Sequence, residues 1–254
     1  RDLHYPLRRQ RQMCIRDRDV FAPGNSGNLI ARIPGADTSQ AMILGAHIDS
    51  PNAPGALDDG SGSAILLEVA RGLDAARHQP PTDLYLVWFG SEELSLYGAA
   101  HFVATHQELL DRTRAMLQID ALSRPLDGID AELRLVAWPY GRHGSPGLPW
   151  PEALTRAAAA RDVETEPFEA YYAYSDNTTF GGFDVPNADL IYEPVVGPDA
   201  SIHYYAHYHD PYDTVDLARE VGDVFEGMAR VALAAALDIT GDVAAVRVSP
   251  RPER

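Results

Sequence analysis

Several short stretches of the sequence combine histidine with acidic residues, the side chains that bind divalent cations. They are His47-Ile48-Asp49, Asp58-Asp59-Gly60, Ser91-Glu92-Glu93, Ile119-Asp120 and His207-Tyr208-His209. Taken singly, each has an ordinary explanation, such as a helix N-cap for the acidic pairs or a surface loop for the histidines. Taken together, they offer imidazole and carboxylate ligands, for which zinc is the default ion.

The elements expected around these stretches indicate how they could meet. Short apolar runs alternate with helical patterns, which predicts an α/β fold with a mostly parallel sheet and helices on both faces. Ligands bind beyond the carboxyl ends of the strands in such sheets, and three of the stretches follow expected strands directly. We therefore expect their side chains at one edge. The expected strands are 41–48, 83–89, 115–119, 133–137 and 188–192, and the expected helices are 61–75, 96–106, 150–161 and 216–239.

Composition limits the classes of partner. The 254 residues are 45% hydrophobic, enough for one sizeable core, and they carry a net charge of −16. All 21 basic residues are arginines, and so acidic a chain is not expected to bind nucleic acid. The longest apolar stretch contains Arg230 and Asp238, so we expect no membrane span. A single cysteine, Cys14, excludes an internal disulfide and a cysteine-based zinc site.

The first residues differ from the rest. Residues 1–18 contain six of the arginines and neither helical nor strand periodicity, and they resemble translated sequencing-adapter sequence. We interpret them as a non-native tail on a single domain spanning residues 19–254, whose own N-terminus is truncated. A genuine basic arm is the alternative.

The motifs, in order, resemble those of the co-catalytic zinc exopeptidases of the bacterial leucyl aminopeptidase and glutamate carboxypeptidase type. The resemblance extends from about Asn28 to Asp238. It rests on H-x-D-S at 47–50, A-x-D-D-x-S-G at 56–62, two glutamates after one strand, an aspartate after the next, and H-x-x-x-D-T at 209–214. It implies a three-layer α/β/α fold with a mostly parallel, mixed central sheet, and a two-zinc hydrolase.

The resemblance also assigns a ligand set for two Zn²⁺ per chain. His47 and Asp120 would complete one site, Glu93 and His209 would complete the other, and Asp58 would bridge both. Two Zn²⁺, these three carboxylates and one bridging hydroxide are together electrically neutral. Spacing alone does not decide which of the two adjacent glutamates is the ligand. His209 is preferred to its neighbouring histidines because it stands four residues before the Asp-Thr pair.

Catalytic roles follow from the same resemblance. Glu92 would be the general base, which takes a proton from the metal-bound water and returns it to the leaving amine. Asp49 would accept a hydrogen bond from the free ring N–H of His47 and fix its tautomer. Tyr172 matches a tyrosine that stabilises the oxyanion in some relatives, although packing against a groove wall is an equal alternative. The family also implies a cis peptide bond between Asp58 and Asp59.

One segment departs from the family pattern. Ser175-Asp176-Asn177 resembles an element whose third residue is usually histidine, and asparagine there puts the contribution of this loop to substrate binding in doubt. Asp176 could instead cap the helix that follows.

The function expected is an aminopeptidase that releases N-terminal residues from peptides. A carboxypeptidase or dipeptidase on the same frame is the alternative, but no arginine cluster stands out for a substrate carboxylate and an acidic site favours an amine. A single-zinc, glutaminyl-cyclase-like acyltransferase and an inactive binding domain are further alternatives, each disfavoured by the complete ligand set. The resemblance slightly favours a secreted or periplasmic location, with a cytoplasmic one as the alternative, and the sequence indicates no oligomeric state.

Overall fold

The structure, a computed structural model, describes residues 14–20, 26–122, 131–137, 159–160, 166–168, 175–183, 185–194 and 207–238. Within these residues eight strands form one mixed sheet. The central four strands pair in parallel, and antiparallel pairs flank them on both sides. The order is β1 (Cys14–Val20), β2 (Gly27–Ile33), β4 (Thr82–Phe89), β3 (Asp37–His47), β5 (Thr113–Leu122), β8 (Asn187–Pro194), β6 (Ala131–Ala137) and β7 (Glu166–Phe168).

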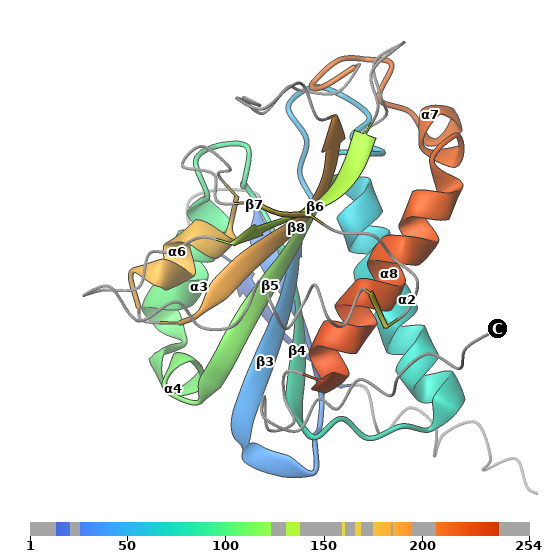
Figure 1. The fold of residues 1–254 in the computed structure, drawn as a ribbon. Coiled ribbons are helices and arrows are strands. Elements are labelled where there is room, and N and C mark those ends of the chain that lie inside the picture. The colour runs from blue at the N-terminus through green and yellow to red at the C-terminus, as the bar shows by residue number, and fades with distance from the viewer. Residues whose placement is uncertain are drawn as a thin grey trace, which may run out of the picture.

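Helices cover both faces of the sheet, which confirms the expected three-layer α/β/α arrangement (Figure 1). One layer contains α2 (Gly60–Ala76) and α8 (Gly222–Asp238), with the short α7 (Val215–Arg219) just before α8. The other layer contains α3 (Tyr97–Thr105), α4 (Gln107–Leu110) and α6 (Asn177–Gly181). Among the described residues, no helix combines the length and hydropathy that a bilayer crossing requires.

Strand β3 lies at the centre of the sheet and is buried on both faces. Its second half is a continuous run of buried residues, as expected for a central parallel strand between two helical layers. Met42, Leu44 and Ala46 belong to the core cluster that includes the buried residues of α2 and α8. Ala41 and Ile43 point the other way, into the cluster formed with α3 and α6. The strand is therefore fixed from both faces, and so is His47 at its end.

Three expectations need correction or stay open. The helix expected over 216–239 is two helices, because the chain turns before Gly222 while the buried Val221 packs into the core. The residues set aside as a tail include most of strand β1, which pairs with β2; the non-native origin of 1–18 stays a prediction. The helix expected over 150–161 lies outside the described residues except for 159–160.

Candidate functional site

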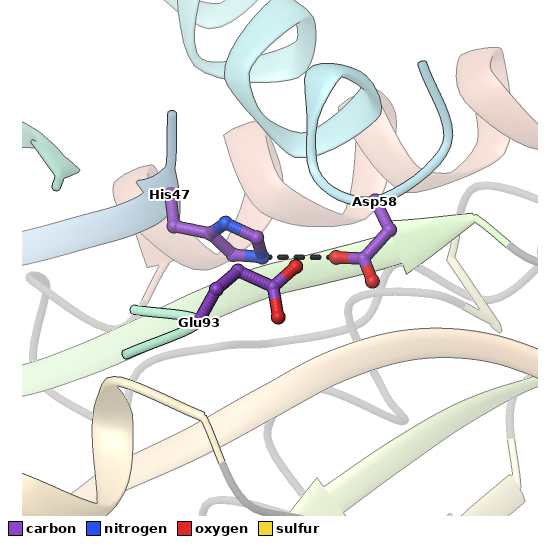
Figure 2. Close-up of side chains that lie close together, drawn as sticks. All are labelled: His47, Asp58 and Glu93. Atoms are coloured by element: carbon purple, nitrogen blue, oxygen red, sulfur yellow. Dashed lines mark hydrogen bonds and ion pairs between the residues drawn. The ribbon is translucent and has the colours of Figure 1, made fainter. Parts of the chain in front are cut away.

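The register of the parallel strands brings the predicted residues to one edge of the sheet. His47 at the end of β3 pairs with Phe89 at the end of β4, just before the two glutamates. Gly45 pairs with Gln118 of β5, which places Asp120 level with His47. The Asp58 loop closes over this edge before α2 begins, and Figure 2 shows His47, Asp58 and Glu93 converging from three separate elements.

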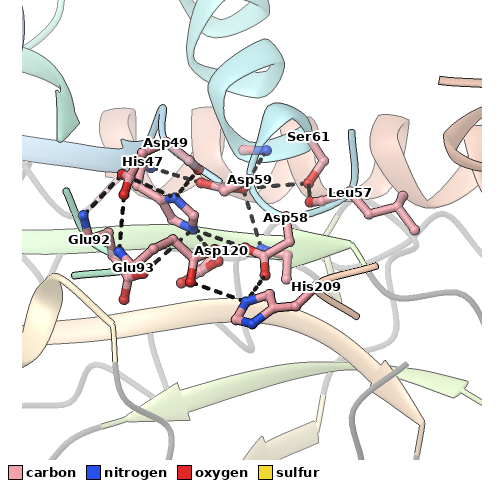
Figure 3. Close-up of polar contacts among 12 residues, drawn as sticks. His47, Asp49, Leu57, Asp58, Asp59, Ser61, Glu92, Glu93, Asp120 and His209 are labelled. Atoms are coloured by element: carbon pink, nitrogen blue, oxygen red, sulfur yellow. Dashed lines mark hydrogen bonds and ion pairs between the residues drawn. The ribbon is translucent and has the colours of Figure 1, made fainter. Parts of the chain in front are cut away.

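The two oxygens of the Asp58 carboxylate face different histidines. Oδ1 lies 3.0 Å from Nε2 of His47, which is also 3.4 Å from Oδ1 of Asp120. Oδ2 lies 3.1 Å from Nε2 of His209, which is also 3.1 Å from Oε2 of Glu93. The five predicted ligand residues therefore meet in two groups that share Asp58 (Figure 3).

The donor set fits divalent cations. Nε2 of His209 is buried and, although two carboxylate oxygens are close, it is not aligned for a hydrogen bond with any described residue. Oε1 of Glu93 is likewise buried without a hydrogen-bond partner among the described residues. Ligand atoms of His47, Asp58 and Glu93 all lie within 4.8 Å of one another. Nε2 of His47 makes a hydrogen bond of 3.0 Å with Oδ1 of Asp58, whereas Nε2 of His209 and Oε1 of Glu93 point into the group without one, as ligand atoms around a common centre do.

Crowded carboxylates dominate the electrostatics. Burial raises the pKa of Glu92 to about 10, and the charge of Asp120 adds to the shift. Burial and the charge of Asp58 raise the pKa of Glu93 to about 7. Burial alone would lower the pKa of His47, but the nearby carboxylates outweigh it and raise the pKa well above its usual value. Such a group of acids ionises together only beside strong positive charge, which divalent cations supply.

Asp59 belongs to the structural support of the site. Its carboxylate accepts the backbone N–H groups of His47 (2.9 Å), Gly62 (2.8 Å) and Ala121 (3.3 Å). Asp59 also lies within 4.8 Å of His47 and Asp120 in ligand-atom distance, but both of its oxygens are already engaged by these N–H groups. It caps α2, as the alternative interpretation of the acidic pair allowed, and the Asp58–Asp59 peptide bond is cis, as predicted.

The expected role of Asp49 is corrected. The ring Nδ1 of His47 lies 3.1 Å from the backbone carbonyl oxygen of Asp49, whereas the carboxylate is 3.8 Å away. That carboxylate instead accepts the backbone N–H of Glu92 at Oδ1 (3.0 Å) and of Glu93 at Oδ2 (3.1 Å). A spacing of two residues indicated that Asp49 lies near His47 but not where its side chain points.

The other candidates are not among the converging ligand atoms. His207 bonds Asp210 through Nδ1 at 3.0 Å and does not reach the ligand group, whereas His209 does. Asp176 occupies the N-cap position of α6, as the alternative allowed, but its side chain makes no capping bond; it is fully buried, accepts from Gln118 at 3.4 Å, and lies close enough for its charge to raise the pKa of Glu92. Ser175 and Asn177 are also buried and offer no surface to a substrate. Tyr172 and His203 lie outside the described residues.

One residue of the site was missed. Asp213, noted in the sequence only as part of H-x-x-x-D-T, is buried, and its carboxylate accepts the backbone N–H groups of Leu57 and Asp58. These contacts join residues about 155 positions apart, so no local pattern could reveal them. The motif itself was the available signal, because it placed an aspartate at a fixed distance after His209.

Known proteins resemble this chain in sequence and in fold. Leucine aminopeptidase 1 of Penicillium rubens is 32% identical over 196 residues, covering 71% of this chain and 50% of the relative. The chain thus spans about half the length of the curated relatives it matches. A zinc aminopeptidase from Bacillus subtilis shares the fold with a TM-score of 0.67 at 22% identity, over 82% of this chain and 50% of that one.

A glutaminyl cyclase from Bacteroides thetaiotaomicron shares the fold as well, with a TM-score of 0.63 at 15% identity, over 89% of this chain and 82% of that one. Fold similarity at such identities therefore does not separate the two activities. The family comparison covers most of the chain, from residue 28 to residue 234. On that match, the chain belongs to peptidase family M28.

Proposed function

We propose that this chain is the catalytic part of a two-zinc aminopeptidase that releases N-terminal residues from peptides. The observation that carries the proposal is the Asp58 carboxylate, which turns one oxygen toward His47 and the other toward His209. In this proposal His47 and Asp120 hold one ion, and Glu93 and His209 hold the other. When bound, Zn²⁺ lowers the pKa of a coordinated water from about 15.7 toward about 7 and polarises the scissile carbonyl.

Glu92 is the proposed general base. Its side chain is largely buried, with Oε2 4.0 Å from Nε2 of His47, on the side where the ligand atoms converge. The pKa of Glu92 falls when divalent charge is bound beside it, because positive charge favours the carboxylate. The carboxylate then accepts a proton from the attacking water and returns it to the leaving amine, so the same group serves both steps.

Charge around the site supports recognition of an amine. The site concentrates carboxylates at the carboxyl ends of the strands, which attract the ammonium of a peptide N-terminus. Arg32 and Arg112 instead bind Asp83 at the other end of β4, at 2.7 Å and 2.9 Å. These two arginines therefore form ion pairs within the sheet and are not positioned to bind a substrate carboxylate.

A two-part assay on the purified protein tests the proposal. Elemental analysis should give two zinc ions per chain, and a peptide with a free amine should be cleaved whether or not its C-terminus is amidated. N-acetylation of the same peptide should abolish cleavage. Cleavage that survives acetylation but fails on amidation would indicate a carboxypeptidase. One ion per chain together with cyclisation of an N-terminal glutamine would indicate the acyltransferase.

A further inference from the structure

Asp213 joins two loops that carry ligand residues. It stands just before α7, and its side chain is buried. Oδ1 accepts the backbone N–H of Leu57 at 2.8 Å and Oδ2 accepts that of Asp58 at 3.2 Å. The backbone carbonyl of Asp213 also accepts the N–H of Ala56 at 3.3 Å. Three successive N–H groups of the Asp58 loop therefore donate to one residue.

These bonds bear directly on the direction of the Asp58 side chain. A carboxylate that accepts two consecutive N–H groups fixes the plane of the peptide between them, and charged acceptors form the stronger hydrogen bonds. The peptide held in this way is the one that enters Asp58, so its orientation sets where the Cα–Cβ bond of Asp58 points. That direction determines whether Oδ1 and Oδ2 can face His47 and His209 at the same time.

Asp213 is equally tied to the loop of His209. It follows that histidine by four residues, and its own N–H donates to the carbonyl of Asp210 at 3.1 Å. By contrast, His47 and Asp120 are held by the paired strands β3 and β5. The group around His47 thus rests on the sheet, whereas the group around His209 rests on loops that Asp213 connects.

Asp213 is not required to begin the helix that follows. Thr214 occupies the N-cap of α7, where its hydroxyl accepts the N–H of Leu217 at 3.4 Å. The side-chain oxygens of Asp213 point instead to the loop before α2. Thr214 therefore caps α7, whereas Asp213 connects the two loops that carry Asp58 and His209.

We propose that Asp213 is a positioning residue that couples Asp58, which both ions share, to His209, and that it controls the affinity of the ion held by Glu93 and His209 more than that of the ion held by His47 and Asp120. The proposal rests on the two-zinc function proposed above. Asn at position 213 keeps one acceptor oxygen and loses the other, so it releases one of the two N–H groups without changing the size of the side chain.

The test uses the full chain, stripped with a chelator and titrated with Zn²⁺ by calorimetry and with Co²⁺ alone by visible absorption. For Asp213→Asn we expect one dissociation constant close to that of the wild type and a second raised by about 10- to 100-fold, the usual effect of losing a hydrogen bond that supports a ligand. Excess Zn²⁺ should restore much of the peptidase activity. Thr214→Ala is the control, because it removes the α7 cap and leaves both Co²⁺ binding steps in place.

The outcomes separate the two proposals. A wild type that binds fewer than two ions overturns both. A wild type with two ions, beside an Asp213→Asn variant whose two affinities are unchanged or equally weakened, overturns only the positioning role. If the variant does not fold, hydrogen exchange on the wild type decides: slow exchange of the Leu57 and Asp58 amides supports the coupling, and rapid exchange refutes it. Asp213→Glu, which keeps both oxygens on a longer side chain, should bind the second ion better than Asp213→Asn.

Discussion

The substitution Asp49→Asn distinguishes two accounts of how the glutamate pair is held. In the structure the Asp49 carboxylate accepts the N–H groups of Glu92 and Glu93 at 3.0 Å and 3.1 Å. Asparagine has the same size and keeps one acceptor oxygen, but its amide nitrogen cannot accept. The contact between Nδ1 of His47 and the backbone carbonyl of residue 49 should not change, since it involves no side-chain atom of Asp49.

The size of the effect follows from the bond that is lost. A hydrogen bond to a charged group contributes about 1.5–3 kcal/mol. If that energy is needed to keep Glu92 aligned in the transition state, the loss corresponds to a fall in kcat of about 10- to 150-fold, at about 1.36 kcal/mol for each factor of ten. The ion at His47 should stay bound, because His47 keeps its own hydrogen-bond partner.

The assay combines kcat and KM on a leucyl peptide with zinc content by elemental analysis. Asp37→Asn is a matched control: Asp37 also accepts a backbone N–H, from Ser39 at 2.9 Å, but it is only partly buried and lies at the far end of β3. We expect the control to keep the wild-type kcat. Loss of both zinc ions from Asp49→Asn would refute the reasoning, because it would mean that the carboxylate supports His47 as well as the glutamates. An unchanged kcat would refute it as well.

Three further predictions test other parts of the molecule. Glu92→Gln should keep two zinc ions by elemental analysis and lose about 10²- to 10⁴-fold in kcat, as expected when a general base is removed; normal turnover would exclude Glu92 as the base. In chelator-treated protein the pKa of Glu93 is about 7, above its ordinary value of 4.5, so the folded chain binds more protons than the unfolded chain between these values and its stability should fall as pH rises through this window. Zinc binds the ionised carboxylate, so calorimetry in buffers of different ionisation enthalpy should detect proton release near pH 6, and no release would contradict the assignment. A Cβ at Gly62 would lie 2.2 Å from the carbonyl oxygen of Ile119, so Gly62→Ala should lower the free energy of unfolding in urea by at least about 1–3 kcal/mol. Gly72→Ala, on the same helix but without a close neighbour, should raise it by about 0.5–1 kcal/mol, and equal effects of the two substitutions would refute the packing argument.

The central part of the fold was predictable because its signals are local. The second half of strand β3 is a continuous apolar run, and α2 has apolar residues at helical spacing. Each element can therefore be recognised from its own residues alone. Strand β1 was missed, because its charged sequence shows no strand pattern and it forms the edge of the sheet, paired only with β2 among the described strands. The break before Gly222 was missed as well, since periodicity continues across it and the packing of Val221 decides the turn.

Some features of the candidate site could likewise be predicted from the sequence, and others could not. The resemblance named the five ligand residues, and the strand ends explain why His47, Glu93 and Asp120 share one edge. Hydrogen bonds from side chain to backbone could not be anticipated. The carboxylate of Asp49 turns away from the histidine two residues earlier, and that of Asp213 reaches a loop about 155 residues away. Such bonds depend on tertiary placement, which spacing does not encode.

Three acids that are not proposed as ligands share one physical role. Asp49 accepts the N–H of Glu93, Asp59 accepts that of His47, and Asp213 accepts that of the bridging Asp58. Each therefore holds the peptide of a proposed ligand through the partial positive charge of a backbone N–H group. An arginine in their place would bring full positive charge and compete with the cations for the ligand carboxylates.

A backbone N–H group stabilises the negative charge of each of these three aspartates without competing with the cations for the ligand carboxylates. This explains how so many acids can lie together in a buried site. It also predicts a pattern for Asp→Asn variants. Replacing Asp49 should affect turnover through Glu92, replacing Asp59 should weaken the ion at His47, and replacing Asp213 should weaken the ion at His209. A uniform loss of stability in all three, with no difference in which ion is lost, would mean that these acids only hold the fold together.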